Sequence, residues 1–159
     1  MSSSRPGPDV PNLGFVRPPL VYLSAIIMGV ILHLVAPVSF FPRTLAMPFG
    51  IALVLIAIAL LLSSIARFRA AGTPVPAYKP TTAIVRKGPY RFTRNPIYLG
   101  FSLLQLGIAI WVNSVWLLIT LAGAMVLMNY AVIRKEEQYL ERRFGSEYVD
   151  YKSSVRRWL

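Results

Sequence analysis

The stretch from Lys87 to Gly100, KGPYRFTRNPIYLG, holds the residues best suited to chemistry. Basic side chains stand beside the Asn95–Pro96 pair, and an apolar run follows. Proline has a fixed φ and no N–H, so it suits the first turn of a helix, and asparagine before it is a natural N-cap. A helix start with free N–H groups beside cations suits an anionic group such as a carboxylate or phosphate. The alternative is a basic loop that only orients a membrane helix.

A second chemical signal is the acidic pair Glu136 and Glu137, which follows the last apolar run of the chain. A carboxylate at that position could bind vicinal ribose hydroxyls or a cationic group of a ligand. The alternative is a solvated helix start, in which Glu137 pairs with a neighbour such as Arg134. The residues alone leave both interpretations open.

Composition places these residues in a membrane protein. The chain has 159 residues, enough for one domain, and 55% of them are hydrophobic. A net charge of +11 could indicate nucleic-acid binding. We expect no such partner, because the cations lie between long apolar runs, as in the cytoplasmic loops of membrane proteins. Without cysteine and with one histidine, neither a thiolate site nor a multi-histidine metal site is expected, so we predict no bound metal.

Long apolar runs predict an all-α integral membrane protein with about four transmembrane helices. The runs are 20–41, with Pro37 as a possible kink and His33 of unassigned role; 48–65, which Pro48 opens; 96–112, which is short for a full crossing; and 115–133. Asn113 and Ser114 separate the last two runs, so these should form a tight antiparallel hairpin. That hairpin would bring Glu136 and Glu137 close to Asn95 and Pro96.

The connections predict the orientation. Residues 67–94 form a basic connection without any acid, which we expect to be an ordered lid or wall, and residues 1–19 form a flexible tail. A single domain then covers residues 20–159. Both termini and the long connection should be cytoplasmic, because the opposite connections carry only Arg43. Gly100, Gly107 and Gly123 should allow the transmembrane helices to approach closely.

The polar end of the chain, residues 134–159, predicts an amphipathic helix that continues the fourth run. Leu140, Phe144, Tyr148 and Tyr151 recur on one apolar stripe. Gly145 should end this helix and Ser146 should begin another. Such an element would lie on the membrane surface or fold back over the long basic connection.

The order GPYRFTRNPIYLG, two apolar runs and EEQYLERRFGSEYVDYKSSVRRWL resembles the membrane methyltransferases of the isoprenylcysteine carboxyl methyltransferase and phospholipid methyltransferase superfamily. That pattern is a GxYxxxRHPxYxG loop and helix, a transmembrane hairpin, and a Glu-Glu helix followed by FGxxYxxY. The resemblance covers about residues 72–159. It implies S-adenosylmethionine as the methyl donor and a lipid-like or small amphiphilic acceptor that is reached from the membrane.

The resemblance also implies which residues form the site, between the basic connection and the C-terminal amphipathic helix. The implied cofactor contacts, named by position, are Thr82, Ala83, Ile84, Val85, Tyr90, Asn95, Pro96, Ile97, Tyr98 and Glu136. Arg94 and Asn95 are candidate catalytic residues. The chain departs from the pattern at Asn95, where histidine is usual. Asn95 cannot replace an imidazole that acts as a base, but asparagine suffices if this position supplies its backbone and a hydrogen bond. The chain departs again at Val132, where the carboxyl methyltransferases place a substrate-contacting arginine. Arg134, which is nearby but on another helical face, is the candidate substrate-binding residue.

The implied reaction is a direct in-line methyl transfer, in which the protein mainly supplies proximity and alignment. A carboxylate acceptor needs no general base, whereas an amine acceptor must lose a proton. Isoprenylcysteine-like chemistry, phospholipid N-methylation, an NADPH-dependent reductase similar to the sterol reductases, and a non-catalytic membrane module stay open as alternatives. The residues indicate neither the acceptor atom nor the oligomeric state.

Overall fold

The computed structural model describes residues 16–73 and 81–159, and these are entirely helical and irregular, without strands. The expected flexible tail lies almost wholly outside these residues, as does the middle of the long basic connection. The helices are α1 (Pro18–Val35), α2 (Arg43–Ala70), η1 (Gly88–Arg91, 3₁₀), α3 (Pro96–Val112), α4 (Val115–Met128), η2 (Asn129–Ile133, π), α5 (Arg134–Phe144) and α6 (Ser146–Ser154).

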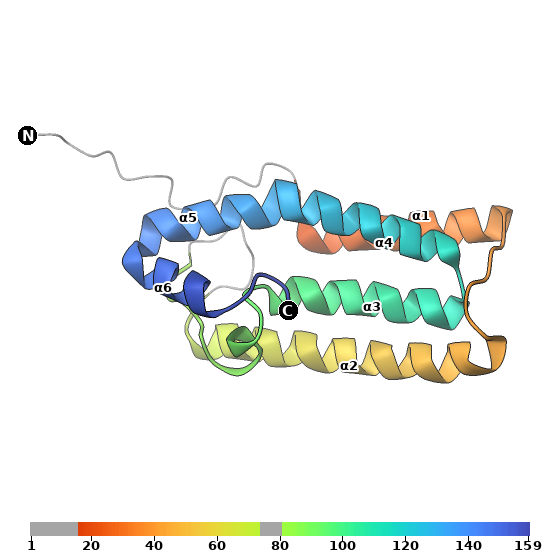
Figure 1. The fold of residues 1–159 in the computed structure, drawn as a ribbon, viewed down its shortest axis with the longest axis horizontal. Helices are drawn as coiled ribbons and strands as arrows, with labels where there is room; N and C mark the ends of the chain where they lie inside the picture. The colour runs from red at the N-terminus through yellow and green to blue at the C-terminus, as the bar shows by residue number, and fades with distance from the viewer. Residues whose placement is uncertain (1–15, 74–80) are drawn as a thin grey trace, which may run out of the picture.

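The long helices lie side by side along the long axis of the molecule (Figure 1). α2 packs along α3, α1 packs along α4, and contacts between α3 and α4 join the two pairs. The α2–α3 contact depends on small residues: a Cβ on Gly50 would lie 2.5 Å from the backbone nitrogen of Trp111, and one on Gly107 would lie 2.9 Å from that of Val54. Gly100 also faces α2, but a Cβ on Gly123 would have no neighbouring atom within 4 Å. The expected close approach at Gly123 is therefore wrong.

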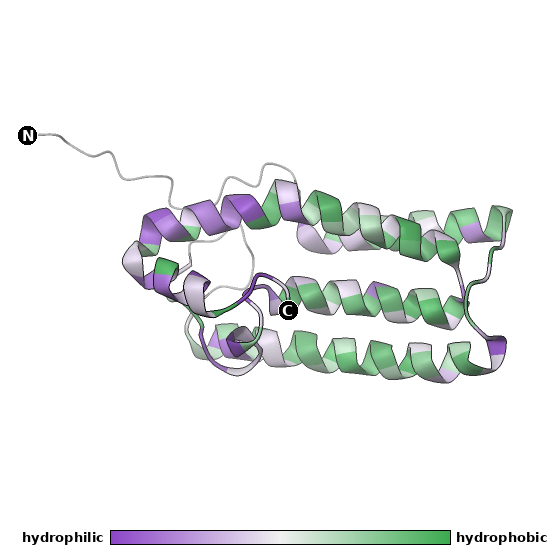
Figure 2. Cartoon of the chain, viewed as in Figure 1, coloured by the Kyte–Doolittle hydropathy of each residue, from purple (hydrophilic) through white to green (hydrophobic). Residues whose placement is uncertain are grey.

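Apolar helices confirm the all-α membrane fold. Within residues 16–73 and 81–159, three helical stretches are long and apolar enough to cross a membrane, namely α1, α2 and the continuous stretch Val115–Phe144, while α3 is a shorter apolar helix. Figure 2 shows hydrophobic residues along the whole bundle and hydrophilic residues gathered at one end, on α5, α6 and the neighbouring loops. The bundle therefore has an apolar body and a single large polar end.

Two helix boundaries differ from the prediction. α1 ends at Val35, so Pro37 follows the helix and does not kink it. α2 begins at Arg43 and ends at Ala70, and Pro48 lies inside its second turn instead of opening it. Because Pro48 has no N–H, α2 lacks one intrahelical hydrogen bond there, and the packing of α2 against α3 offsets this loss. Hydropathy marks the apolar part of a helix, not the residues at which the backbone hydrogen bonds end.

The tight α3–α4 hairpin is confirmed, with Asn113 in the left-handed conformation (φ 58°). The Asn113 side chain accepts hydrogen bonds from the Phe40 and Phe41 N–H groups at 3.0 and 2.8 Å, and donates one to the Phe41 carbonyl at 2.7 Å. This amide therefore fastens the hairpin turn to the α1–α2 connection. His33 lies in the last turn of α1, at this same end of the bundle and away from the polar end.

The fourth apolar run continues without interruption through η2 into α5, as predicted. Gly145 ends α5 with a positive φ of 55°, and α6 begins at Ser146. Beyond α6, residues 155–159 return to the start of α3, where the Arg94 N–H donates to the Arg156 carbonyl at 2.9 Å. The polar end is thus built from segments that are far apart in the sequence.

Candidate functional site

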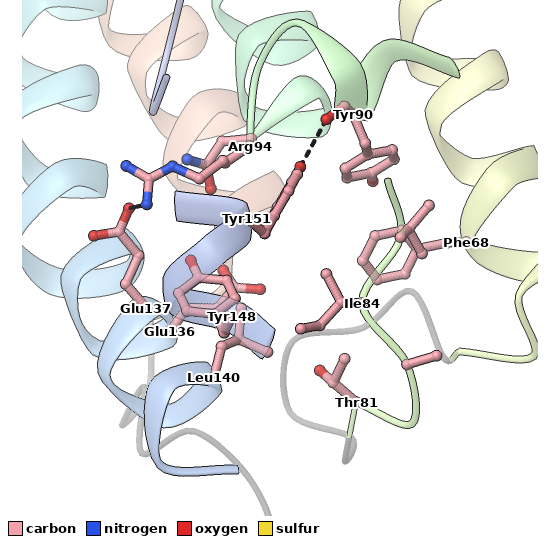
Figure 3. A pocket seen from close by; sticks show the side chains of 13 residues that line it. Phe68, Thr81, Ile84, Tyr90, Arg94, Glu136, Glu137, Leu140, Tyr148 and Tyr151 are labelled. Carbon is pink, nitrogen blue, oxygen red and sulfur yellow. Dashed lines mark hydrogen bonds and ion pairs between the residues drawn. The ribbon is translucent and has the colours of Figure 1, made fainter. Parts of the chain in front are cut away.

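A pocket opens at the polar end of the bundle (Figure 3). Its empty volume is about 460 Å³, a figure that includes space open to solvent at the mouth. Four regions of the chain supply its walls. The lining residues are Phe68, Thr81, Ala83, Ile84, Val85, Tyr90, Arg94, Asn95, Glu136, Glu137, Leu140, Tyr148 and Tyr151.

The two neighbouring glutamates have different partners. Glu137 is 6% exposed and receives a two-pronged hydrogen bond from Arg157, with Nε–Oε1 at 3.0 Å and Nη2–Oε2 at 2.6 Å. Arg94 lies 3.3 Å from the same carboxylate. The Glu136 carboxylate accepts a hydrogen bond from the Tyr98 hydroxyl at 2.9 Å and, within the described residues, has no arginine within ion-pair distance. Glu137 is therefore neutralised inside the protein, whereas Glu136 has no cationic partner among the described residues.

Three tyrosines line the pocket as neutral side chains. Burial raises the pKa of Tyr90 and of Tyr148 well above the ordinary value, and it raises that of Tyr151 to about 12. These hydroxyls therefore stay protonated at neutral pH and act as hydrogen-bond donors, not as bases. Tyr151 donates to the Tyr90 carbonyl at 2.8 Å. The Tyr90 hydroxyl is itself buried and has no hydrogen-bond partner in the described parts of the chain.

Aromatic rings form opposite walls of the pocket. Phe68 at the end of α2 packs against Tyr90, with ring centroids 5.2 Å apart, and on the other side Tyr148 contacts Tyr151 edge to face at 6.2 Å. Figure 3 shows the Phe68 and Tyr90 rings on one side and the Tyr148 and Tyr151 rings on the other, with Ile84 between them. Flat apolar walls of this kind suit a planar ring such as a nucleobase.

The start of α3 is fastened by the C-terminal segment, residues 155–159. The Arg157 carbonyl accepts hydrogen bonds from the Thr93 hydroxyl and from the Asn95 side-chain amide, both at 3.0 Å. The expectation that the Asn95 side chain caps α3 is therefore wrong, because its amide is engaged with the C-terminal segment and makes no capping hydrogen bond. The N–H groups at the start of α3 are correspondingly not covered by that side chain.

The structure brings six of the ten predicted cofactor residues to the pocket wall, namely Ala83, Ile84, Val85, Tyr90, Asn95 and Glu136. The other four, Thr82, Pro96, Ile97 and Tyr98, are not among the lining residues. Tyr98 lies one step behind Glu136 as its hydrogen-bond donor, and Ile97 packs against the core where α1, α3 and α4 meet. Thr82 donates to the Gly72 carbonyl at 3.1 Å.

The candidates outside that set also have defined places. Arg94 lines the pocket, but Arg134 stacks over the Tyr130 ring at 4.2 Å and does not line it. Val132 is fully buried in the core, so the position that carries an arginine in the carboxyl methyltransferases holds an apolar packing residue here. The sequence reasoning placed Tyr148 and Tyr151 on an apolar stripe without assigning them to the site. No sequence pattern marks Arg157, which reaches Glu137 only because the folded chain returns to the site.

Parts of the chain are similar to known proteins. The chain is 38% identical over 63 residues to an uncharacterized protein of Haemophilus influenzae; the match covers 40% of this chain and the whole relative. It is 37% identical over 73 residues to the nickel-cobalt-cadmium resistance protein NccN of Alcaligenes xylosoxydans xylosoxydans, a match that covers 46% of this chain and 34% of that protein. No solved structure matches the chain. The phospholipid methyltransferase profile matches residues 45–147, which include most of α2, all of α5 and every pocket-lining residue except Tyr148 and Tyr151, so the chain belongs to the phospholipid methyltransferase family.

Proposed function

We propose that this protein is an S-adenosylmethionine-dependent methyltransferase that acts on a lipid-like or small amphiphilic acceptor at the cytoplasmic face of a membrane. The observation that carries the proposal is the pocket at the polar end of the bundle, where Glu136 and the Tyr90 hydroxyl lack protein partners that would fully satisfy them. The family and the apolar helices support it as well, since the family consists of membrane methyltransferases.

The pocket residues fit the proposed cofactor. The buried Tyr90 hydroxyl needs an acceptor, because a buried donor without a partner is costly. Glu136 can accept from ribose hydroxyls or from the ammonium group, and the aromatic walls suit adenine. When bound, the cofactor supplies a methyl group on an already activated sulfonium. The residues that would hold it are Tyr90, Ile84, Val85 and Glu136, with the backbone at Asn95.

The described residues act mainly by binding and alignment. The three pocket tyrosines stay protonated, the Asn95 amide is engaged with the Arg157 carbonyl, and Glu137 is paired with arginines. Glu136 is then the pocket group that can still accept a proton or a cation. An acceptor that is already nucleophilic, such as a carboxylate, needs only to be aligned with the methyl group. An amine acceptor would transfer its proton to Glu136 or to water.

The bundle supports a membrane-borne acceptor. Apolar side chains are exposed along α1, α2 and α4, and the pocket lies at the end where these helices meet the polar segments. An acceptor with an apolar body in the bilayer would present its head group at that level. The cations of the polar end would face the cytoplasm, so the water-soluble donor would enter from there.

Ligand-dependent thermal stability of the purified protein tests this proposal. S-adenosylmethionine and its product S-adenosylhomocysteine should each raise the midpoint of unfolding, because a ligand that binds only the folded state stabilises it. NADPH should not. Stabilisation by NADPH alone would instead favour the reductase alternative, and no response to any of the three would favour a non-catalytic module.

Transfer of a labelled methyl group tests the acceptor class. Incubation with a total lipid extract should label the lipid fraction, and a cytosolic extract should stay unlabelled. Glu136→Gln provides the matched inactive control, since it removes the free carboxylate with little change in volume. Label that enters only soluble protein or nucleic acid would contradict the lipid-like acceptor while leaving the methyltransferase assignment standing.

A further inference from the structure

Arg94 is a buried cation on the wall of the pocket. Its side chain is 8% exposed, and its Nε and Nη1 atoms are buried without a hydrogen-bond partner in the part of the chain that the structure describes. Nη1 lies 3.3 Å from Glu137 Oε1, within ion-pair distance but without hydrogen-bond geometry, and the guanidinium also interacts with the Tyr148 hydroxyl. A guanidinium group has five N–H donors, so these contacts leave several of them unused.

Among the described residues, Arg94 shares its carboxylate partner with a second arginine. Arg157 already holds both oxygens of Glu137, at 3.0 and 2.6 Å, so one carboxylate faces two guanidinium groups. This cluster of Arg94, Glu137 and Arg157 therefore carries an excess of one positive charge. Glu136, the other pocket carboxylate, is engaged with Tyr98 and forms no ion pair with an arginine of the described residues. Arg94, the more buried of the two arginines, therefore shares its counterion, which compensates a buried charge less well than a counterion of its own.

Arg94 is not needed to neutralise Glu137, because Arg157 does so with a bidentate hydrogen bond that is close to ideal for an arginine–carboxylate pair. A structural role in neutralising Glu137 therefore does not account for Arg94 at the pocket wall. A ligand that brings a negative group would use the free donors and cancel the excess charge at once.

We propose that Arg94 binds an anionic group of the ligand, a carboxylate or phosphate, through its unused guanidinium donors. The inference rests on the proposed function and deepens it. Two ligands could carry that group: the methyl donor, through the carboxylate of its amino-acid part, or the acceptor, through an anionic head. In either case the pocket separates charge, with Glu136 for cationic or hydroxyl groups and Arg94 for the anion. Arg94 is then a binding residue and not a proton donor or acceptor in the reaction.

Pairs of ligands that differ by the anionic group test this inference. S-adenosylhomocysteine carries the amino-acid carboxylate, and 5′-methylthioadenosine lacks the whole amino-acid part. Short-chain phosphatidic acid carries a phosphate, and the diacylglycerol with the same chains does not. Calorimetry gives the dissociation constants of the first pair, and thermal stability gives the response to the second pair. These are measured for the unchanged protein, for Arg94→Gln and for the control Arg91→Gln, which removes an exposed cation that does not line the pocket.

If the donor supplies the anion, Arg94→Gln should weaken S-adenosylhomocysteine binding about tenfold or more and leave 5′-methylthioadenosine unchanged. If the acceptor supplies it, Arg94→Gln should abolish the stabilisation by phosphatidic acid and leave both nucleosides unchanged. Arg91→Gln should change neither the dissociation constants of the first pair nor the thermal response to the second pair. Equal behaviour of Arg94→Gln and the unchanged protein toward both pairs would overturn the inference, even where S-adenosylhomocysteine binds well. Failure of the unchanged protein to bind S-adenosylhomocysteine would instead contradict the proposed function.

Arg94→Lys keeps the charge and serves if Arg94→Gln does not fold. Lysine offers a single ammonium in place of the planar fork, so it should weaken binding of the anionic member of the responsive pair a fewfold. The neutral member should be unaffected. Equal affinities of Arg94→Lys and the unchanged protein for both members of both pairs would also overturn the inference.

Discussion

At the scale of single residues, two adjacent carboxylates at the site have different roles. Glu136 and Glu137 are the same residue type at neighbouring positions, and both lie in the first turn of α5. Rotation by one residue turns Glu137 toward Arg94 and Arg157, whereas Glu136 reaches Tyr98 beside the pocket. Substitution of Glu136 should therefore affect ligand binding, and substitution of Glu137 should affect stability.

Glu136→Gln should weaken S-adenosylmethionine binding by about 1–3 kcal/mol, because the change removes a charged acceptor while it keeps the size of the side chain. Calorimetry on the purified protein measures the loss. Glu141→Gln is the matched control, since Glu141 pairs with Lys152 at the surface and does not line the pocket. A dissociation constant that is the same for Glu136→Gln and the unchanged protein would remove Glu136 from the site.

Glu137→Gln should lower the free energy of unfolding by about 3–5 kcal/mol, because it leaves the buried Arg94 and the partly exposed Arg157 without their carboxylate. Thermal unfolding measures this, and the midpoint should fall well below that of Glu136→Gln. The reverse order of the two midpoints would show that the roles assigned to the glutamates are exchanged.

At the scale of elements, the helices could be predicted because each carries its own signal. Four apolar runs, the hairpin at Asn113–Ser114 and the break at Gly145 all appear in the structure. The helix ends were harder to predict. The end of α1 and the start of α2 depend on backbone hydrogen bonds and on Asn113, which is remote in sequence and binds the connection between these two helices. An apolar run does not encode those partners.

The site was predictable to the extent that its residues are local to a motif. Ala83, Ile84, Val85, Tyr90 and Asn95 belong to one such stretch, and the hairpin brings Glu136 to it. Tyr148, Tyr151 and Arg157 reach it only because α6 turns back at Gly145 and the chain then returns to Thr93–Asn95. This path depends on contacts between segments that are about 60 residues apart. A local pattern marks the two tyrosines, but no local pattern marks these contacts.

The packing of α2 on α3 makes a prediction for Gly50. Gly50→Ala should destabilise the fold by about 1–3 kcal/mol, because its Cβ would lie 2.5 Å from the Trp111 backbone and force the two helices apart. Alanine normally favours a helix over glycine by about 1 kcal/mol, so a loss must come from the clash. Gly123→Ala is the control, since its Cβ would have nothing within 4 Å and the change should be neutral or stabilising. Equal unfolding midpoints for the two variants would contradict the close α2–α3 contact.

At the scale of the whole molecule, charge is distributed very unevenly along the bundle. Among the described residues, Arg43 is the only arginine or lysine at the end that holds the α1–α2 connection and the α3–α4 turn. The other described arginines and lysines lie at the end that holds the pocket, on or beside α5, α6 and the loops. Because positively charged connections are retained in the cytoplasm, this asymmetry predicts that the pocket and both termini face the cytoplasm.

Cysteine labelling tests this orientation cleanly, because the chain has no cysteine of its own. The α3–α4 turn would be a natural place for the introduced cysteine, but Ser114 in that turn is fully buried and would not react even with a reagent on its own side of the membrane. Thr44 at the start of α2 and Lys87 beside the pocket are exposed and serve better. Thr44→Cys should react with a membrane-impermeant maleimide added to intact cells, and Lys87→Cys should react only after the membrane is opened. If Lys87→Cys reacts in intact cells and Thr44→Cys does not, the bundle has the opposite orientation, and the methyl donor would have to reach the pocket from the other side.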